Sequence, residues 1–158
     1  MSDEPYLKGT PEEVFKRGYN SYRSEYYEEA YLYFDHVLKN ASDENLLSDS
    51  KKYLRNCVEY LTYYKDKMSE IEYHYNQGKF YLNCAHYESY NKLTNLDKAE
   101  FHFKQTLDYA KTLNSISYVR KLREDPIINV RFYIEEFEKL LQECESTSDY
   151  LNSDEYQP

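Results

Sequence analysis

The stretch from Glu44 to Asn91 constrains the fold more than any other part of the sequence. It contains no proline and a single glycine, Gly78. Apolar or small residues recur along it in alternating steps of three and four, which places them on one face of an α-helix. The stretch therefore predicts helix throughout. The residues of this stripe are Leu54, Cys57, Leu61, Tyr64, Met68, Ile71, Tyr75, Gly78, Leu82 and Ala85.

One helix or two would satisfy this pattern. A single helix over 44–91 would be about 70 Å long at 1.5 Å per residue. A compact globule of this chain length is only about 40 Å across. Ser69 followed by Glu72 also matches a capping box, which offers a second helix start. We therefore expect two helices, over about 44–66 and 70–91, with the single long helix as the alternative.

The flanking segments carry further helix signals. Thr10, Pro11 and Glu13 form a helix start in which threonine caps the helix and proline occupies the first turn. A second stripe with helical spacing runs from 27 to 38. A third helix is expected to begin at Asn95, and Asp125-Pro126 marks the start of a last one. With only 3 glycines and 4 prolines, a strand-rich fold would lack the residues that tight turns need.

These signals predict an all-α protein of about six antiparallel helices, arranged as a short solenoid or an irregular helical bundle. The expected organisation is an N-terminal lead-in over 1–10, one helical domain over 11–145 and a disordered acidic tail over 146–158. The tail is assigned because everything after Lys139 is acidic or neutral, and because polar, acidic chain ends rarely bury enough apolar surface to order themselves.

Charge and cysteine usage narrow the class of protein. The 29 acidic and 20 basic residues give a formal net charge of -9, which disfavours binding to nucleic acid phosphates. A local basic patch of Arg120, Lys121, Arg123 and Arg131 is too small to reverse this and is interpreted as a solvated helix face, paired with the acidic tail. No apolar run at the start or elsewhere suggests a signal or a membrane span. Three scattered cysteines without a CxxC pair are typical of reduced thiols, so we expect a cytoplasmic protein, with the nucleus left open, and no membrane partner.

No motif for catalysis or for a cofactor stands out. The three glycines are isolated, which excludes dinucleotide and P-loop phosphate cradles. Glu70 and His74 lie one helical turn apart and could share a metal, but a surface ion pair is the favoured interpretation. Cys84 and His86 are two residues apart, on different helix faces, and make a poor metal pair. The sequence therefore predicts no catalytic residue, no cofactor and no metal site, and hence not an enzyme.

Phe15 to Leu38 resembles a tetratricopeptide repeat (TPR), in which pairs of antiparallel helices stack into a solenoid. The motif places a small residue in the first helix, where Gly18 stands. Its second helix has an aromatic, a small and again an aromatic residue, which Tyr27, Ala30 and Phe34 match. The same second-helix pattern recurs at Leu96, Ala99, Phe103 and Leu107, with Gly78 and Tyr81 resembling the start of its partner helix.

This resemblance covers roughly residues 12–42 and, more weakly, 78–110. Arg17 stands where the family favours an apolar residue, and Ser42 where it favours proline. The second copy has about nine extra residues between its two helices, and no clean copy lies between the two. The resemblance implies a TPR-like short solenoid that binds another protein.

The 21 tyrosines are the remaining unusual feature. Tyrosine combines an apolar ring with a polar tip and is enriched at protein interfaces. We expect a non-catalytic adaptor or scaffold that binds a partner protein or peptide, one carrying basic groups, through a Tyr-rich helical groove. The alternatives are a homo-oligomer associating through 44–91 and, less favoured, a nucleic-acid-associated regulator using the basic patch. The candidate partner-binding residues are Tyr19, Tyr22, Arg23, Tyr26 and Tyr33.

Overall fold

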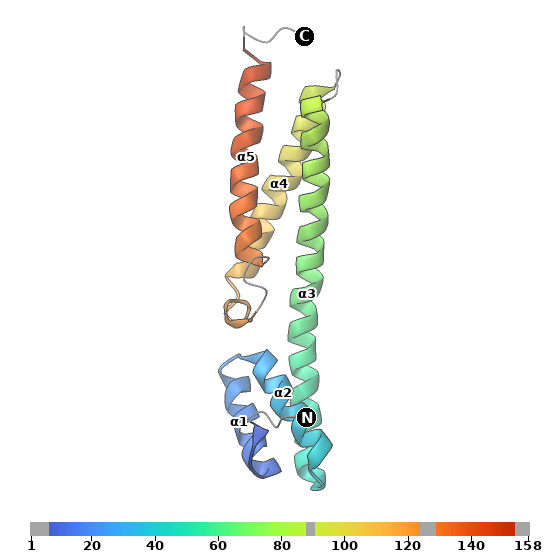
Figure 1. Cartoon of the computed structure of the whole chain (residues 1–158), viewed down its shortest axis with the longest axis vertical. Helices are drawn as coiled ribbons and strands as arrows, with labels where there is room; N and C mark the ends of the chain where they lie inside the picture. The colour runs from blue at the N-terminus through green and yellow to red at the C-terminus, as the bar shows by residue number, and fades with distance from the viewer. Residues whose placement is uncertain (1–6, 88–90, 124–128, 154–158) are drawn as a thin grey trace. The chain divides into compact units, whose positions relative to one another are not determined.

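The computed structural model describes residues 7–87, 91–123 and 129–153, and all regular structure within these ranges is helical. The elements are α1 (Pro11–Arg23), α2 (Tyr27–Asn40), α3 (Glu44–Tyr87), α4 (Lys92–Asn114), the short 3₁₀ helix η2 (Val119–Lys121) and α5 (Val130–Leu151) (Figure 1). The predicted all-α class is confirmed. The described ranges hold five α-helices and η2, where the sequence predicted about six helices.

The chain forms two compact units, and α3 contributes residues to both. Unit 1 comprises residues 1–65 and 116–123, and therefore holds α1, α2, the first part of α3 and η2. Unit 2 comprises residues 66–115 and 124–158, and holds the second part of α3 with α4 and α5. The stretch 11–145, expected from the sequence as one helical domain, is thus divided within α3.

Helix α3 is continuous from Glu44 to Tyr87. The expectation of two helices over 44–66 and 70–91 is therefore wrong. Ser69, the predicted cap, is an exposed residue inside the helix. Tyr64 before it and Ile71 after it are both buried on the apolar stripe. An unbroken helix keeps this stripe on one face and keeps the backbone hydrogen bonds that a break would lose. The expected diameter of about 40 Å applies to one compact unit, whereas the chain forms two.

Unit 1 is built on a helical hairpin of α1 and α2. The Thr10 side chain accepts a hydrogen bond from the Glu13 backbone N–H at 3.2 Å, so the predicted cap is confirmed. The two helices cross closely at Gly18, where a Cβ atom would lie 2.8 Å from the Cβ of Tyr33 and 3.1 Å from the ring of Phe34. Only glycine fits that crossing. Around it, Val14, Ala30, Phe34 and Val37 have no exposed surface.

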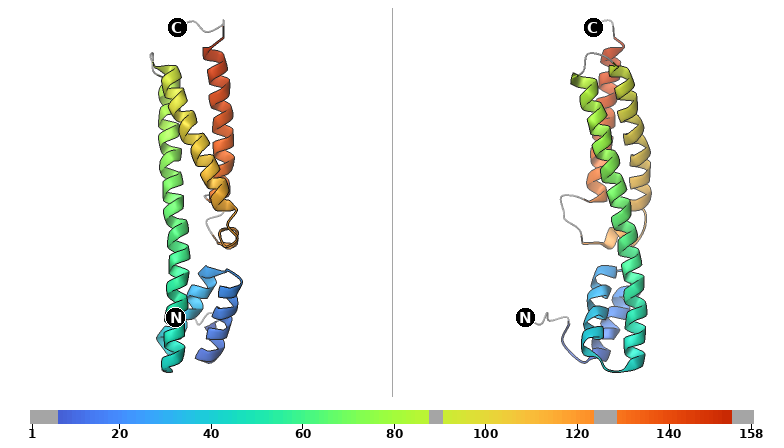
Figure 2. Two further views of the ribbon diagram at one scale, coloured as in Figure 1. Left: turned by 180° about the vertical axis from the view of Figure 1, so that it is seen from behind. Right: turned by 90° about the vertical axis from the view of Figure 1, so that its right-hand side faces the viewer.

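Unit 2 places its core between the second part of α3 and the pair α4 and α5, which pack side by side (Figure 2). Gly78 lies directly against the ring of Phe103, and the rings of Phe103 and Phe137 are 6.0 Å apart. The buried residues come from all three helices and follow the predicted stripes. They include Ile71, Leu82 and Ala85 from α3, Leu96, Ala99, Phe103 and Ala110 from α4, and Val130, Phe137 and Cys144 from α5.

Two helix ends differ from the sequence prediction. Helix α4 begins after Asn91, which has a positive φ of 60°, rather than at Asn95. Helix α5 continues to Leu151, so the tail expected to be disordered from 146 is helical up to that residue. Its apolar face explains the extension, since Cys144 is fully buried and Thr147 and Leu151 are partly buried. The predicted start at 125–126 and the end of the tail, 154–158, lie outside the described residues.

Candidate interaction surface

Two of the five predicted contact residues, Tyr19 and Tyr22, belong to the aromatic packing of unit 1. The ring of Tyr53 on α3 lies 5.6 Å from that of Tyr19 and 5.0 Å from that of Tyr22. The Tyr22 hydroxyl accepts a hydrogen bond from the Asn56 side chain at 3.1 Å. Burial raises the pKa of Tyr22. These two tyrosines therefore pack α1 against α3, and both side chains remain partly exposed.

The other three candidates lie nearer the surface of unit 1. Arg23 is exposed, with its guanidinium 5.8 Å from the centre of the Tyr19 ring. Tyr26 is 42% exposed, and the Lys121 ammonium lies 5.2 Å from its ring centre. Tyr33 is partly buried and lines a pocket of about 230 Å³ with Arg123. Of the five residues, Arg23 and Tyr26 are thus exposed, whereas Tyr19, Tyr22 and Tyr33 are partly buried.

Two residues of the basic patch, Lys121 and Arg123, form ion pairs within unit 1. Lys121 pairs with Glu25 at 3.7 Å, and Arg123 pairs with Glu29 at 2.5 Å. The backbone N–H of Arg123 also donates to the Glu28 carboxylate at 3.1 Å. Burial raises the pKa of Glu28, and this N–H opposes the rise. Two of the four basic side chains are therefore paired with carboxylates at residues 25–29, just before and at the start of α2, whereas the sequence predicted pairing with the acidic tail.

Three further tyrosines pack η2 against the rest of unit 1. The rings of Tyr27 and Tyr60 stack at 4.2 Å, and the Tyr118 ring meets both edge-on at 5.3 and 5.2 Å. The Tyr118 hydroxyl donates to the Tyr60 carbonyl at 3.1 Å. Much of the tyrosine content therefore serves internal packing, because the hydroxyl lets a large ring be buried beside backbone acceptors.

A different set of aromatic side chains faces solvent on α3 in unit 2. Tyr73, Phe80 and Tyr87 are 59%, 59% and 86% exposed. They are spaced seven residues apart, which brings them into line along a helix, on the side opposite the buried residues Ile71 and Gly78. The residues that lie between these three aromatics on this side are uncharged: Asn76, Gln77, Asn83 and Cys84. We call these seven residues the outer aromatic face of α3.

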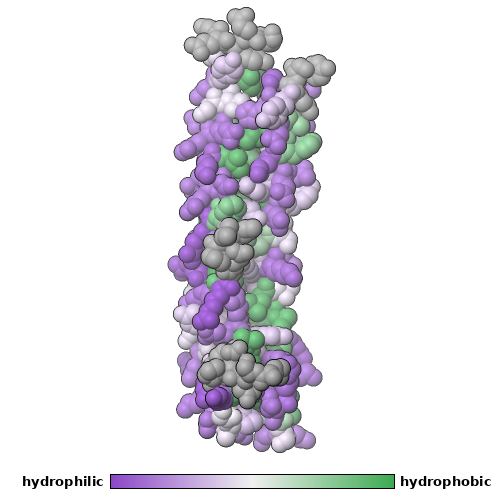
Figure 3. All heavy atoms as spheres, viewed as in Figure 1, coloured by the Kyte–Doolittle hydropathy of each residue, from purple (hydrophilic) through white to green (hydrophobic). Residues whose placement is uncertain are grey.

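The seven residues of this face carry no charge, although charged residues make up 31% of the chain. The side of the molecule seen in Figure 3 is mostly hydrophilic, with hydrophobic residues showing in narrower strips. The outer aromatic face was not predicted from the sequence, because only the stripe of buried residues on the same helix was considered. The spacing of 73, 80 and 87 was the signal that could have found it.

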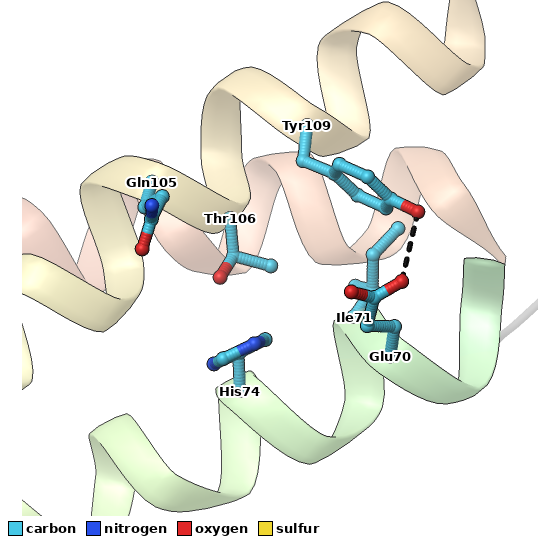
Figure 4. A pocket seen from close by; sticks show the side chains of 6 residues that line it. All are labelled: Glu70, Ile71, His74, Gln105, Thr106 and Tyr109. Carbon is cyan, nitrogen blue, oxygen red and sulfur yellow. Dashed lines mark hydrogen bonds between the residues drawn. The ribbon is translucent and has the colours of Figure 1, made fainter.

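A second feature of unit 2 is a pocket of about 190 Å³ between α3 and α4 (Figure 4). The Tyr109 hydroxyl donates to the Glu70 carboxylate across it at 3.0 Å. The Nδ1 atom of His74 lies 3.0 Å from the Nδ1 atom of His102. The sequence paired Glu70 with His74, whereas the structure pairs each with a residue of α4. The pocket is lined by Glu70, Ile71, His74, Gln105, Thr106 and Tyr109.

The described residues contain no group of three or more His, Cys, Asp or Glu side chains placed to hold a metal. Burial raises the pKa of the Cys57 and Cys144 thiols to about 12 each, which keeps both protonated and unreactive. Over the same described ranges, we find no helix with the length and apolar character that crossing a membrane requires.

Comparison with known proteins returns no match to this chain among family models, curated proteins or solved structures.

Proposed function

We propose that this protein is a non-catalytic adaptor that binds another protein through the outer aromatic face of α3. The observation that carries the proposal is the line of Tyr73, Phe80 and Tyr87, more than half exposed at a seven-residue spacing. Large aromatic side chains are enriched among the residues that dominate binding energy at protein interfaces. Three of them on one face of a regular helix form a rigid contact surface.

The spacing points to a helix as the bound element. Residues seven apart stay in register with a partner helix that packs nearly parallel or antiparallel, as in helix-in-groove recognition and coiled coils. From Tyr73 to Tyr87 the face extends about 21 Å at 1.5 Å per residue, which matches about four turns of a partner helix. The seven residues of the face are uncharged, so docking would bury no ionised group of this chain there and avoid that desolvation cost.

The partner expected is an amphipathic helix with apolar residues on its docking side and basic residues on its flanks. The net charge of -9 would attract such a partner and speed its encounter, because opposite charges steer association. A TPR-like arrangement remains part of the proposal. It is supported by the α1–α2 hairpin that closes on Gly18 and by the contact between Gly78 and Phe103.

Self-association is the second candidate, favoured by the same heptad spacing. Two copies of α3 could pair along their outer aromatic faces, since an uncharged surface lets two acidic chains meet without repulsion at the contact. Phenylalanine and tyrosine are less common than leucine or isoleucine at such a seam. We therefore place a different protein first and a second copy of this chain next.

Affinity capture from cells that produce the protein, with quantitative mass spectrometry, tests the proposal. Phe80→Glu places a charge at the centre of the face. Phe101→Glu is the matched control, because Phe101 on α4 is 61% exposed against 59% for Phe80. We expect Phe80→Glu to lose specific partners that both the unaltered protein and Phe101→Glu retain. Equal recovery with all three proteins, or equal loss with both variants, would contradict the assignment.

Light scattering of the purified protein separates the two candidates. The adaptor predicts a monomer of 19.2 kDa at all accessible concentrations. Self-association predicts a mass that rises with concentration and returns to the monomer value in Phe80→Glu.

A further inference from the structure

The two histidines beside the α3–α4 pocket come from different helices and face each other. Their Nδ1 atoms are 3.0 Å apart, and their ring centres are 5.1 Å apart. The Tyr81 ring stacks on His102 at 5.7 Å with an interplanar angle of 9°, which supports one side of the pair. Both histidines are partly buried rather than enclosed, so small solutes can reach them.

Neutral imidazoles suit this geometry. At 3.0 Å one ring must donate its Nδ1–H and the other must accept, because two protonated rings would place two hydrogens and two positive charges against each other. Burial, and then the neighbouring His74, lowers the pKa of His102. This favours the uncharged imidazole of His102, and the uncharged imidazole is the form that ligates metals.

The separation of the two nitrogens suits a chelated cation. With metal–nitrogen bonds of about 2.0–2.1 Å, two ligands at right angles lie about 2.9 Å apart, and two at the tetrahedral angle lie about 3.3 Å apart. The observed 3.0 Å is near the first value. Right-angled nitrogen ligands are typical of Cu²⁺ and Ni²⁺ sites. Each ring would need only to turn about its own side-chain bonds, so that its lone pair meets the ion instead of the other nitrogen.

We propose that His74 and His102 form a binding site for a divalent late transition metal, Cu²⁺ or Ni²⁺ in preference to Zn²⁺, that bridges α3 and α4. The two Nδ1 atoms are the protein ligands. Water fills the other coordination positions, because the adjoining pocket of about 190 Å³ has room for several water molecules.

The pocket supplies the negative charge that such an ion needs nearby. Glu70 lies one helical turn before His74 on α3, and its carboxylate faces the same pocket. The Tyr109 hydroxyl, which donates to it at 3.0 Å, fixes its orientation. In the bound state Glu70 accepts a hydrogen bond from a metal-bound water, an outer-shell role that typically changes metal affinity by about tenfold or more.

Isothermal titration of the chelator-treated full-length protein with CuCl₂, NiCl₂ and ZnCl₂ at pH 7.5 tests the site. We expect one Cu²⁺ or Ni²⁺ per chain, with Zn²⁺ weaker. His74→Asn and His102→Asn should each weaken binding by more than tenfold, and Glu70→Gln by less than either. The matched controls are His36→Asn and His86→Asn, which alter the other two histidines of the chain and should bind as the unaltered protein does.

A spectroscopic readout keeps the result independent of folding. The electron paramagnetic resonance spectrum of the Cu²⁺ form should show two nitrogen donors, one of which is lost in either variant, while circular dichroism confirms that each variant is helical. The proposal is overturned if the unaltered protein shows no saturable binding below about 1 mM. It is equally overturned if the His74 and His102 variants bind as tightly as the controls.

Discussion

Replacing Gly78 with alanine should destabilise unit 2, although the same change usually stabilises a helix. Gly78 lies within α3 and is buried against the ring of Phe103. In an ordinary helix interior, alanine is favoured over glycine by about 1 kcal/mol. The added Cβ would here lie 2.8 Å from both Cδ1 and Cζ of Phe103. Ordinary carbon contacts are about 3.5–4.0 Å, so the ring or the helix must move.

The size of the effect follows from how little room the ring has. Phe103 has no exposed surface, and its ring packs 6.0 Å from that of Phe137. Overpacking a close-packed core typically costs about 1–3 kcal/mol. Set against the gain in helix propensity, Gly78→Ala should lower the free energy of unfolding by about 1–2 kcal/mol, because a fully enclosed ring lies at the costly end of that range.

Urea unfolding followed by circular dichroism measures this change. Asn76→Ala is the control, since Asn76 is exposed on the same helix and should be neutral or slightly stabilised. A Phe103→Leu background removes the ring edge that meets the new Cβ. In that background, Gly78→Ala should lower the free energy of unfolding by much less than it does in the unaltered protein. The difference is the interaction energy between the two sites. A Gly78→Ala protein as stable as the unaltered one would refute the close approach of α3 and α4 at this point.

Three further predictions follow from other parts of the chain. Because folding lowers the pKa of His102 from its ordinary 6.5, the unfolded chain binds a proton at His102 more tightly than the folded chain does. Stability should therefore fall as pH drops through 6.5 and below, and this slope should flatten in His102→Gln; an unchanged slope would contradict it. Brief alkylation at pH 8 should label the partly exposed Cys84 before Cys57 and Cys144, because burial raises the pKa of those two thiols to about 12. Mass spectrometric peptide mapping measures the labelling of each cysteine, and equal labelling of all three would count against the burial of Cys57 and Cys144. Thr10→Ala should cost about 1 kcal/mol in thermal or urea unfolding by removing the helix cap, whereas Thr10→Ser should not.

The sequence allowed the helical class and most buried faces to be predicted, because both depend on local periodicity. The stripes through Phe34, Phe103 and Phe137 are buried as their spacing required. The cap at Thr10 could be predicted because its partner, the Glu13 N–H, is only three residues away. Such signals lie within one or two turns of chain, where spacing determines which side chains meet.

The continuity of α3 could not be decided in the same way. The Ser69–Glu72 pattern is a valid local start signal, and only the surrounding packing shows that it is not used. The division into two units also depends on which helices pack together, which periodicity does not contain. The end of α5 was predicted too early, because the polar and acidic composition after residue 145 indicated disorder. The helix has a partly apolar face that continues to Leu151.

The candidate site residues were harder still to predict from the sequence. Tyr19 and Tyr22 were assigned to a groove because core and groove residues share one periodicity, and contact with Tyr53 places them in the packing. The two histidines are 28 positions apart and on separate helices, so no spacing rule connects them. Residues that meet through tertiary packing become visible as a site only in three dimensions.

The proposed function depends most on the outer aromatic face of α3 as the contact surface for a partner. Its most direct test is a photo-crosslinking amino acid placed at position 80 and, as the control, at position 101, in cells that produce the protein. We expect a discrete crosslinked adduct to a single partner from position 80 and none from position 101. Adducts of equal yield from both positions, or from position 101 alone, would contradict it.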